Sequence, residues 1–253
     1  VNLVGAKQLS ATSGALPSAS SASFTVTAAA AAALSFQVQP SNAVAGVAIA
    51  PAVQVRVADA FGNGVSESNV ALALVGTGAL SGAAPVATDV NGLATFSALS
   101  VNLAGSKQLS ATSGALPSAT STSFTVSAAT AAALSFQVQP SNAVAGVAIV
   151  PAVQVKVVDT FGNGVSGSSV ALALVGTGTL SGATPVATDV NGLATFSALS
   201  VNLAGSKQLN ATSGALAAVT SDTFTISPSG TAATLSFQVQ PSNVVAGVAI
   251  APA

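Results

Sequence analysis

The chain repeats itself, and the length of the repeat limits what it can fold into. Aligning residues 34–127 with residues 134–227 gives 79 identities over 94 positions, at a period of 100 residues. One residue is inserted after Ser227, so that Phe136 corresponds to Phe237. Solenoid repeats of about 20 to 50 residues need neighbours to bury a core, whereas a period of this length matches one independent domain per repeat. The sequence therefore predicts domains joined in tandem.

The repeat also predicts where those domains begin and end. We expect an incomplete repeat in the first part of the chain, two whole repeats, and the start of another, at residues 1–33, 34–133, 134–234 and 235–253. Both end pieces lack the part that corresponds to residues 53–100, so they cannot complete each other. We therefore favour a segment of a longer array over a filament subunit completed by its neighbour. The expected joints are short: the Ala-rich stretches 28–33 and 128–133, and residues 227–234.

Within one repeat, apolar and polar residues alternate with the period of two that is typical of half-buried strands. Strands are expected at residues 34–39, 53–58, 70–74, 85–88, 93–99, 109–111 and 124–126. Pro40 ends the first, and Asn63-Gly64 reverses the chain because both residues tolerate positive φ. A second such pair, Asn91-Gly92, predicts a hairpin into residues 93–99. About seven short strands predict an all-β, immunoglobulin-like sandwich per repeat, with a barrel as the alternative.

Phenylalanine is the only aromatic residue, and it recurs at equivalent positions of the repeat. The ten residues are Phe24, Phe36, Phe61, Phe96, Phe124, Phe136, Phe161, Phe196, Phe224 and Phe237. Each can bury about 150–250 Å², so we expect core anchors rather than a row of rings that stack on a ligand.

Composition excludes most partner and reaction classes. Only 4% of the residues are charged, against about 25% in an average soluble protein, while 50% are apolar and the net charge is -1. No basic patch is available for nucleic acid, and no apolar run approaches the roughly 18 residues of a membrane-spanning helix. Cys, His, Met, Trp and Tyr are all absent. The sequence predicts no enzyme and no catalytic, cofactor-binding or metal site.

Two acidic turns are nevertheless candidates for calcium, since each has oxygen ligands close together. Asp59 is near Asn63, and Asp89 is near Asn91. Calcium prefers six to eight oxygens with several carboxylates, and the whole chain has only six acids. We therefore expect each Asp side chain to hydrogen-bond the backbone of its own turn.

The remaining candidates have simpler interpretations. The glycine-rich stretches 62–64 and 76–78 lack a following helix or lysine, so we expect turns and not phosphate sites. The equivalent residues Lys7, Lys107 and Lys207 are expected to be exposed on a strand. Asn210 begins a glycosylation sequon, but the equivalent residue of the previous repeat is Ser110. We therefore attribute the sequon to chance.

Two segments of the repeat carry a family resemblance. Residues 57–63 and 88–97, with equivalents at 159–163 and 188–197, are similar to bacterial immunoglobulin-like repeats of cell-surface and secreted proteins, including the adhesin stalks of the invasin and intimin type. The resemblance implies a bacterial, extracellular or cell-surface location and a spacer role.

A neutral surface removes the repulsion that keeps proteins apart. We therefore expect a structural extracellular array, a stalk, fibre or filament component that self-associates with neighbouring copies. The alternative is a multivalent adhesin module that binds a host protein or glycan through the loops at one end of the sandwich, with avidity from many identical sites.

Overall fold

The computed structural model describes residues 1–230 and 234–250, and every element in them is a β-strand. Two compact units form. Unit 1 comprises Val1–Leu134, Lys156–Ser168 and Ala187–Leu193; unit 2 comprises Ser135–Val155, Ser169–Val186 and Ala194–Ala253. The domain boundaries predicted from the repeat remain a proposal. The last joint and the last repeat piece are covered only in part, because residues 231–233 and 251–253 lie outside the described residues.

The first 26 residues form two short antiparallel pairs. Strand β1 (Gly5–Lys7) pairs with β4 (Phe24–Val26), and β2 (Ser10–Ala11) pairs with β3 (Ala19–Ser20). The same pairings recur in each later copy of this sequence.

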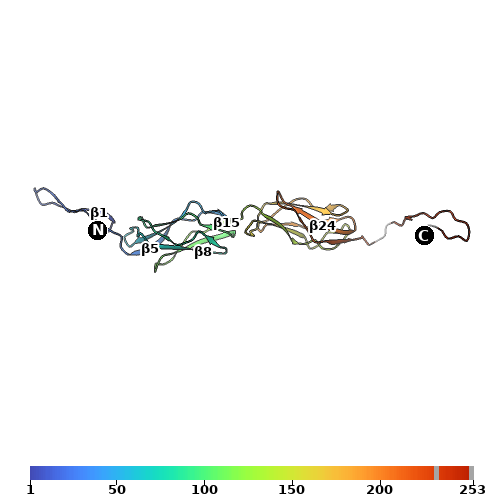
Figure 1. The fold of residues 1–253 in the computed structure, drawn as a ribbon, viewed down its shortest axis with the longest axis horizontal. Helices are drawn as coiled ribbons and strands as arrows, with labels where there is room; N and C mark the ends of the chain where they lie inside the picture. Colours follow the sequence, from blue (N-terminus) through green and yellow to red (C-terminus); the bar gives the residue numbers. More distant parts are fainter. Residues whose placement is uncertain (231–233, 251–253) are drawn as a thin grey trace. The chain divides into compact units, whose positions relative to one another are not determined.

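The first whole repeat is a two-layered sandwich (Figure 1). Its strands are β5 (Ala31–Val38), β6 (Ala43–Val44), β7 (Val53–Asp59), β8 (Asn69–Val75), β9 (Leu80–Ser81), β10 (Val86–Ala87), β11 (Leu93–Phe96), β12 (Ser100–Val101), β13 (Gly105–Thr112), β14 (Ala119–Thr120) and β15 (Phe124–Ser127). One main sheet has the order β11-β7-β5, and the other has the order β10-β8-β13-β15-β6 with β14 beside β13; β9 and β12 form a separate antiparallel pair. The predicted immunoglobulin-like sandwich is confirmed.

The second repeat forms the same sheets. Its strands are β16 (Ala133–Val138), β17 (Ala143–Val144), β18 (Val153–Val158), β19 (Ser169–Val175), β20 (Leu180–Ser181), β21 (Val186–Ala187), β22 (Leu193–Phe196), β23 (Ser200–Val201), β24 (Gly205–Thr212), β25 (Val219–Thr220) and β26 (Phe224–Ser227). The orders are β16-β18-β22 and β17-β26-β24-β19-β21 with β25 beside β24, and β20 and β23 form a separate antiparallel pair.

The core lies between the two sheets and follows the predicted alternation. Along β7, Val53, Val55 and Val57 are fully buried and the residues between them are partly exposed. Leu109 and Ala111 of β13 face them from the other sheet, and the cluster extends from Ala31 to Ala129. Burial of this apolar surface is the main stabilising term of each sandwich.

The structure corrects the expected role of several phenylalanines. Phe96, Phe124, Phe196 and Phe224 are buried in the cores. Phe61 and Phe161, however, are exposed, because they lie in the loops that follow β7 and β18, beyond the end of the sheets. Phe24 and Phe237 are also exposed, since β4 pairs with β1 alone and the described residues 234–250 form no strand.

Two local predictions also change. Residues 31–33 belong to β5, where Ala31 pairs with Asp59, so this Ala-rich joint is shorter than expected. The Asn91-Gly92 turn is present, but it does not close a hairpin: β10 pairs with β8 and β11 with β7, so the turn carries the chain from one sheet to the other. The turn at Asn63-Gly64 and the turn at Asn91-Gly92 lie in close contact. A Cβ added to Gly64 would clash with the backbone carbonyl of Asn91.

One surface turn contains a conformation that suits glycine. Glu67 has φ of 60°, in the left-handed region, and its equivalent in the second repeat is Gly167 with φ of 74°. In both copies a threonine holds this turn: Thr88 Oγ1 donates to the Val65 carbonyl at 2.7 Å, and Thr188 does the same to Val165 at 2.6 Å.

We predict that Glu67→Gly stabilises the first sandwich by up to about 1 kcal/mol, because relief of the left-handed conformation exceeds the added entropy of the unfolded chain. The reverse change, Gly167→Glu, should destabilise the second sandwich by a similar amount. Calorimetric unfolding of the two variants measures both effects. A fall in stability on Glu67→Gly would show that the Glu67 side chain itself contributes.

Candidate functional site

In the part of the chain that the structure describes, side-chain hydrogen bonds are concentrated in a five-residue loop that begins at Asp59, the last residue of β7. Asp59 continues the buried row of Val53, Val55 and Val57, so its carboxylate points inward at the edge of the core. Its Oδ1 accepts hydrogen bonds from the backbone N–H groups of Phe61 and Asn63, each at 2.9 Å. The prediction that this Asp hydrogen-bonds its own turn is confirmed.

The loop also holds the preceding copy of the repeat. Asp59 Oδ2 accepts from the Asn63 amide at 2.9 Å and from the backbone N–H of Ala29 at 3.0 Å. The Asn63 amide donates to the carbonyl of Asn2 at 2.8 Å, and its Oδ1 accepts from the backbone N–H of Val4 at 3.3 Å. We call residues 59–63 and 159–163 the joint loops, and residues 2–5, 102–105 and 202–205 the receiving turns.

The second joint loop makes the same contacts inside unit 1. Asp159 Oδ2 accepts from the backbone N–H of Ala129 at 2.8 Å. Asn163 donates to the carbonyl of Asn102 at 2.9 Å and accepts from the backbone N–H of Ala104 at 2.8 Å. Because two copies form the same three hydrogen bonds to the repeat before them, the contact is a property of the repeat unit.

Hydrogen bonding lowers the pKa of the joint-loop carboxylates. The Asn63 amide, with the N–H groups of Ala29, Asn63 and Phe61, lowers the pKa of Asp59 from 3.8 to about 2 against the opposing effect of burial. For Asp159, burial raises the pKa, but the amide of Asn163 and three backbone N–H groups outweigh it, so its pKa is also lowered. Both groups are thus held as carboxylates at neutral pH.

An aromatic contact accompanies the second joint. The ring of Phe161 lies against Gly46, and a Cβ built on Gly46 would come within 2.4 Å of the ring. Glycine at this position therefore makes room for the ring. Phe61 is 61% exposed and Phe161 is 41% exposed, which is consistent with the additional cover. The sequence predicts both rings to be in the cores. Each ring, however, lies between an Asp and a Gly-Asn pair, and this turn-forming sequence indicates a loop.

The other acidic turn is purely local. Asp89 Oδ1 accepts from the backbone N–H groups of Asn91 at 2.8 Å and Leu93 at 2.9 Å, as predicted. These bonds, the Leu93 N–H first, lower the pKa of Asp89. Residues 1–230 and 234–250 contain no group of three or more His, Cys, Asp or Glu side chains placed to hold a metal ion.

None of the three lysines is exposed as predicted, and Lys7 is half-buried. Lys107 and Lys207 are buried, because each shares the inward face of its strand with the leucine and alanine that follow, as Leu109 and Ala111 do in β13. The period of two that located the strand could have shown this. Asn210, the sequon residue, lies within β24, where it pairs with Ala173 and Thr220.

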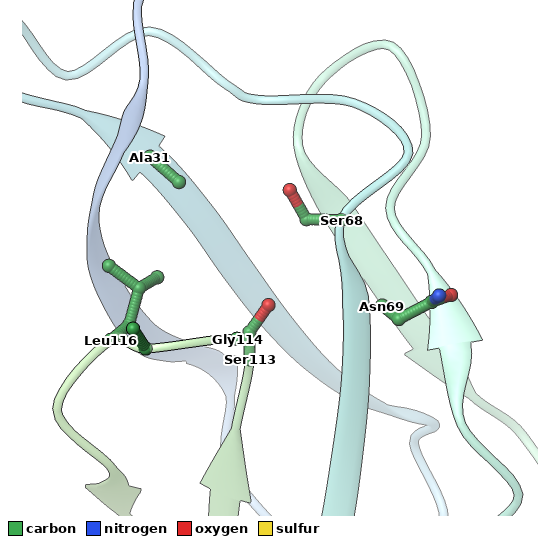
Figure 2. A pocket seen from close by; sticks show the side chains of 7 residues that line it. Ala31, Ser68, Asn69, Ser113, Gly114 and Leu116 are labelled. Carbon is green, nitrogen blue, oxygen red and sulfur yellow. The ribbon is translucent and has the colours of Figure 1, made fainter.

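A shallow hollow of about 530 Å³ lies at the loop end of the first sandwich. Figure 2 shows Ser68 and Asn69 on one side of it and Ser113 and Leu116 on the other. Gly114, Ala115 and Ala31 complete the lining, so no titratable or aromatic side chain faces it. The hollow offers hydroxyl and amide groups for binding, but no acid or base.

No protein-family model matches the chain, and no curated protein matches it either. Among solved structures it is similar to the Escherichia coli adhesin FdeC, at 21% identity and a TM-score of 0.48, over 79% of this chain and 66% of that one. Yersinia pseudotuberculosis InvD is similar at 19% identity and a TM-score of 0.47, over 84% of this chain and 62% of InvD. Invasin, a bacterial integrin-binding protein, matches at 21% identity and a TM-score of 0.36, over 77% of this chain and 39% of invasin.

The likeness is one of fold, and the chain spans less than two thirds of each of these structures. Among the described residues, no helix has the length and apolar character needed to cross a bilayer.

We predict that Gly46→Ala weakens the second joint and that Gly146→Ala does not. Both glycines have positive φ, 74° and 79°, so the backbone strain is the same, but nothing lies within 4 Å of a Cβ on Gly146. Chemical-shift changes at Phe161 and Asn163 in NMR spectra of the two variants measure the difference. Equal changes in both would contradict the Phe161 contact.

The lowered pKa of Asp59 predicts how acid acts on the first joint. Because the folded pKa of about 2 is below the ordinary 3.8, its stabilisation is complete above about pH 4 and is lost as the pH falls toward 2. Asp59→Asn should therefore lower the thermal midpoint at pH 7, and the difference from the unsubstituted chain should shrink between pH 4 and pH 2. Asp222→Asn is the control, since the Asp222 carboxylate is exposed and accepts no hydrogen bond in the described part of the chain.

Proposed function

We propose that this chain is part of a structural extracellular array, a stalk, fibre or filament component in which each repeat is fixed to the one before it by its joint loop. The observation that supports the proposal most directly is the repeated set of hydrogen bonds from Asp59 and Asn63, and from Asp159 and Asn163, to the preceding copy.

The joint loop restricts the motion of one repeat relative to the preceding repeat, because it forms several short hydrogen bonds to that repeat. A single flexible linker leaves two domains free to reorient, which is the default where few contacts cross the boundary. Here one carboxylate and one amide bond three backbone groups on two separate segments, residues 102–104 and Ala129. Bonds that involve a charged acceptor are stronger than those between neutral groups. A chain of such joints is stiff, which suits a spacer.

The same proposal includes a bacterial cell-surface location and lateral association. The location follows from the resemblance of residues 57–63 and 88–97 to surface repeats. Lateral association follows from the low charge, because a net charge of -1 over 253 residues provides little mutual repulsion. Small and hydroxyl residues dominate the exposed faces of the strands. No residue is assigned a catalytic role.

We predict that the two sandwiches keep one orientation in solution. The chain has no cysteine, so Val90→Cys and Val190→Cys, at equivalent and highly exposed positions, provide unique sites for two spin labels. Pulsed dipolar spectroscopy should give one narrow distance distribution, which Asn163→Ala broadens. Asn63→Ala is the matched control, because it removes the same side chain from the joint outside the labelled pair. A broad distribution in the otherwise unsubstituted chain would refute the stiff joint.

The lateral part has a separate measurement. Electron microscopy of the native protein at high concentration should show bundles or filaments, and isolated monomers with flexible links would count against association.

A second candidate function, a multivalent adhesin module, has support from the hollow at Ser68, Asn69 and Ser113 (Figure 2). It lies among loops at one end of the sandwich, where hydroxyl and amide groups could bind a glycan or a protein backbone. Screening the whole chain on glycan and host-protein arrays tests it, with Asn69→Ala as the variant that should reduce any signal. Absence of binding would leave the spacer function alone.

A further inference from the structure

Lys107 is a buried cation that forms no ion pair with a carboxylate of residues 1–230 and 234–250. The residue is only 3% exposed, and its ammonium donates to two neutral oxygens, Thr77 Oγ1 at 3.3 Å and the Ala104 carbonyl at 3.2 Å. Burial of a charged group without an ion pair is costly. Its position in the structure therefore needs an explanation beyond packing.

Two glycines lie beside this side chain. A Cβ on Gly76 would lie 3.3 Å from Lys107 Cδ, and one on Gly105 would lie 3.6 Å from its Nζ. Both glycines have positive φ, 129° and 114°. The aliphatic part of Lys107 thus passes over the backbone of one loop, and the ammonium ends beneath the receiving turn that contains Ala104.

Ala104 is held from two sides. Its carbonyl accepts from Lys107, and its backbone N–H donates to Asn163 Oδ1 of the following joint loop at 2.8 Å. The receiving turn is also fixed at Asn102, whose Oδ1 accepts from the backbone N–H of Ala79 at 2.7 Å. Thr77 and Ala79 belong to the same loop, so Lys107 and Asn102 together fasten the receiving turn to it.

The first receiving turn lacks this support. Lys7 donates no side-chain hydrogen bond within the described residues, and the bond from Val4 N–H to Asn63 Oδ1 is 3.3 Å long, against 2.8 Å at Ala104. The third receiving turn has the lysine hydrogen bonds but no bond to a joint loop within the described residues. Lys207 donates to Thr177 Oγ1 and to the Ala204 carbonyl, each at 3.3 Å, while Ala204 N–H bonds no joint loop in the part of the chain that is described.

We propose that Lys107 is a positioning residue of the joint: by holding the carbonyl of Ala104 it restrains the backbone at the Ala104 Cα, so that the N–H of Ala104, in the preceding peptide group, points at Asn163 of the next repeat. The proposal rests on the proposed stiff joint, and it assigns to the buried cation at one end of a sandwich a role in holding the sandwich that follows.

The labelled chain with Val90→Cys and Val190→Cys tests this directly. Lys107→Met keeps the aliphatic length and removes the ammonium. Molecules in the single orientation should become about fivefold less frequent relative to all other orientations. This is the factor expected for the net contribution of one hydrogen bond to an equilibrium constant. Lys207→Met removes the same group from the equivalent site and should leave the distribution unchanged.

Thr77→Val, with Thr177→Val as its control, provides a milder variant if Lys107→Met unfolds the sandwich; it should broaden the distribution in the same direction. An unchanged distribution in folded Lys107→Met and Thr77→Val would overturn the positioning role. Equal broadening by the Lys207→Met or Thr177→Val control would overturn it too, since the effect would then be a general loss of stability. A broad distribution before any of these four substitutions would instead refute the proposed function.

Discussion

The structure depends on one carboxylate at the end of a buried row of valines. Asp59, and Asp159 in the next copy, continue the inward face of their strands to the point where the core ends. There the carboxylate collects backbone N–H groups from its own loop and from the preceding repeat, and the asparagine four residues later adds an amide that both donates and accepts. The inward-facing carboxylate of Asp59 is tolerated because each of its hydrogen bonds is short. The same residue therefore ends the core and begins the joint loop.

A similar arrangement closes the other end of the sandwich. The inward row of β13 runs from Lys107 through Leu109 to Ala111. Strand β13 ends next to Ser113, and Ser113 lines the same hollow as Ala31, the strand partner of Asp59. The end of β13 thus lies near Asp59, and Lys107, near the start of β13, lies at the opposite end of the sandwich. Each repeat therefore has a buried anion at its entry and a buried cation at its exit. With so few charges in the chain, a third or more of them serve the ends of the sandwiches.

Most of the fold could be predicted from the sequence, because the period of two is a direct consequence of strand geometry. Val53 to Val57 and Leu109 with Ala111 lie as predicted, and so do the hydrogen bonds of Asp89 to its own turn, although that turn closes no hairpin. The joint was not predicted: Asp59 and Asn63 were recognised as a turn, but their second set of partners comes from residues about 30 and 60 positions away, which no local pattern reports. Phe61 and Phe161 were misplaced because burial was inferred from residue type. The lysines were misplaced because charge was given more weight than strand phase.

Each repeat carries both halves of the joint, the loop at its entry and the turn at its exit, and the copies are nearly identical. A crossover between two copies at matching positions therefore yields a hybrid repeat whose loop and turn still fit its neighbours. Units gained or lost in this way would change the length of the chain in steps of 100 residues while keeping the Asp and Asn of each joint loop and the Asn of each receiving turn. Length can then change without any change in the residues that form the joints.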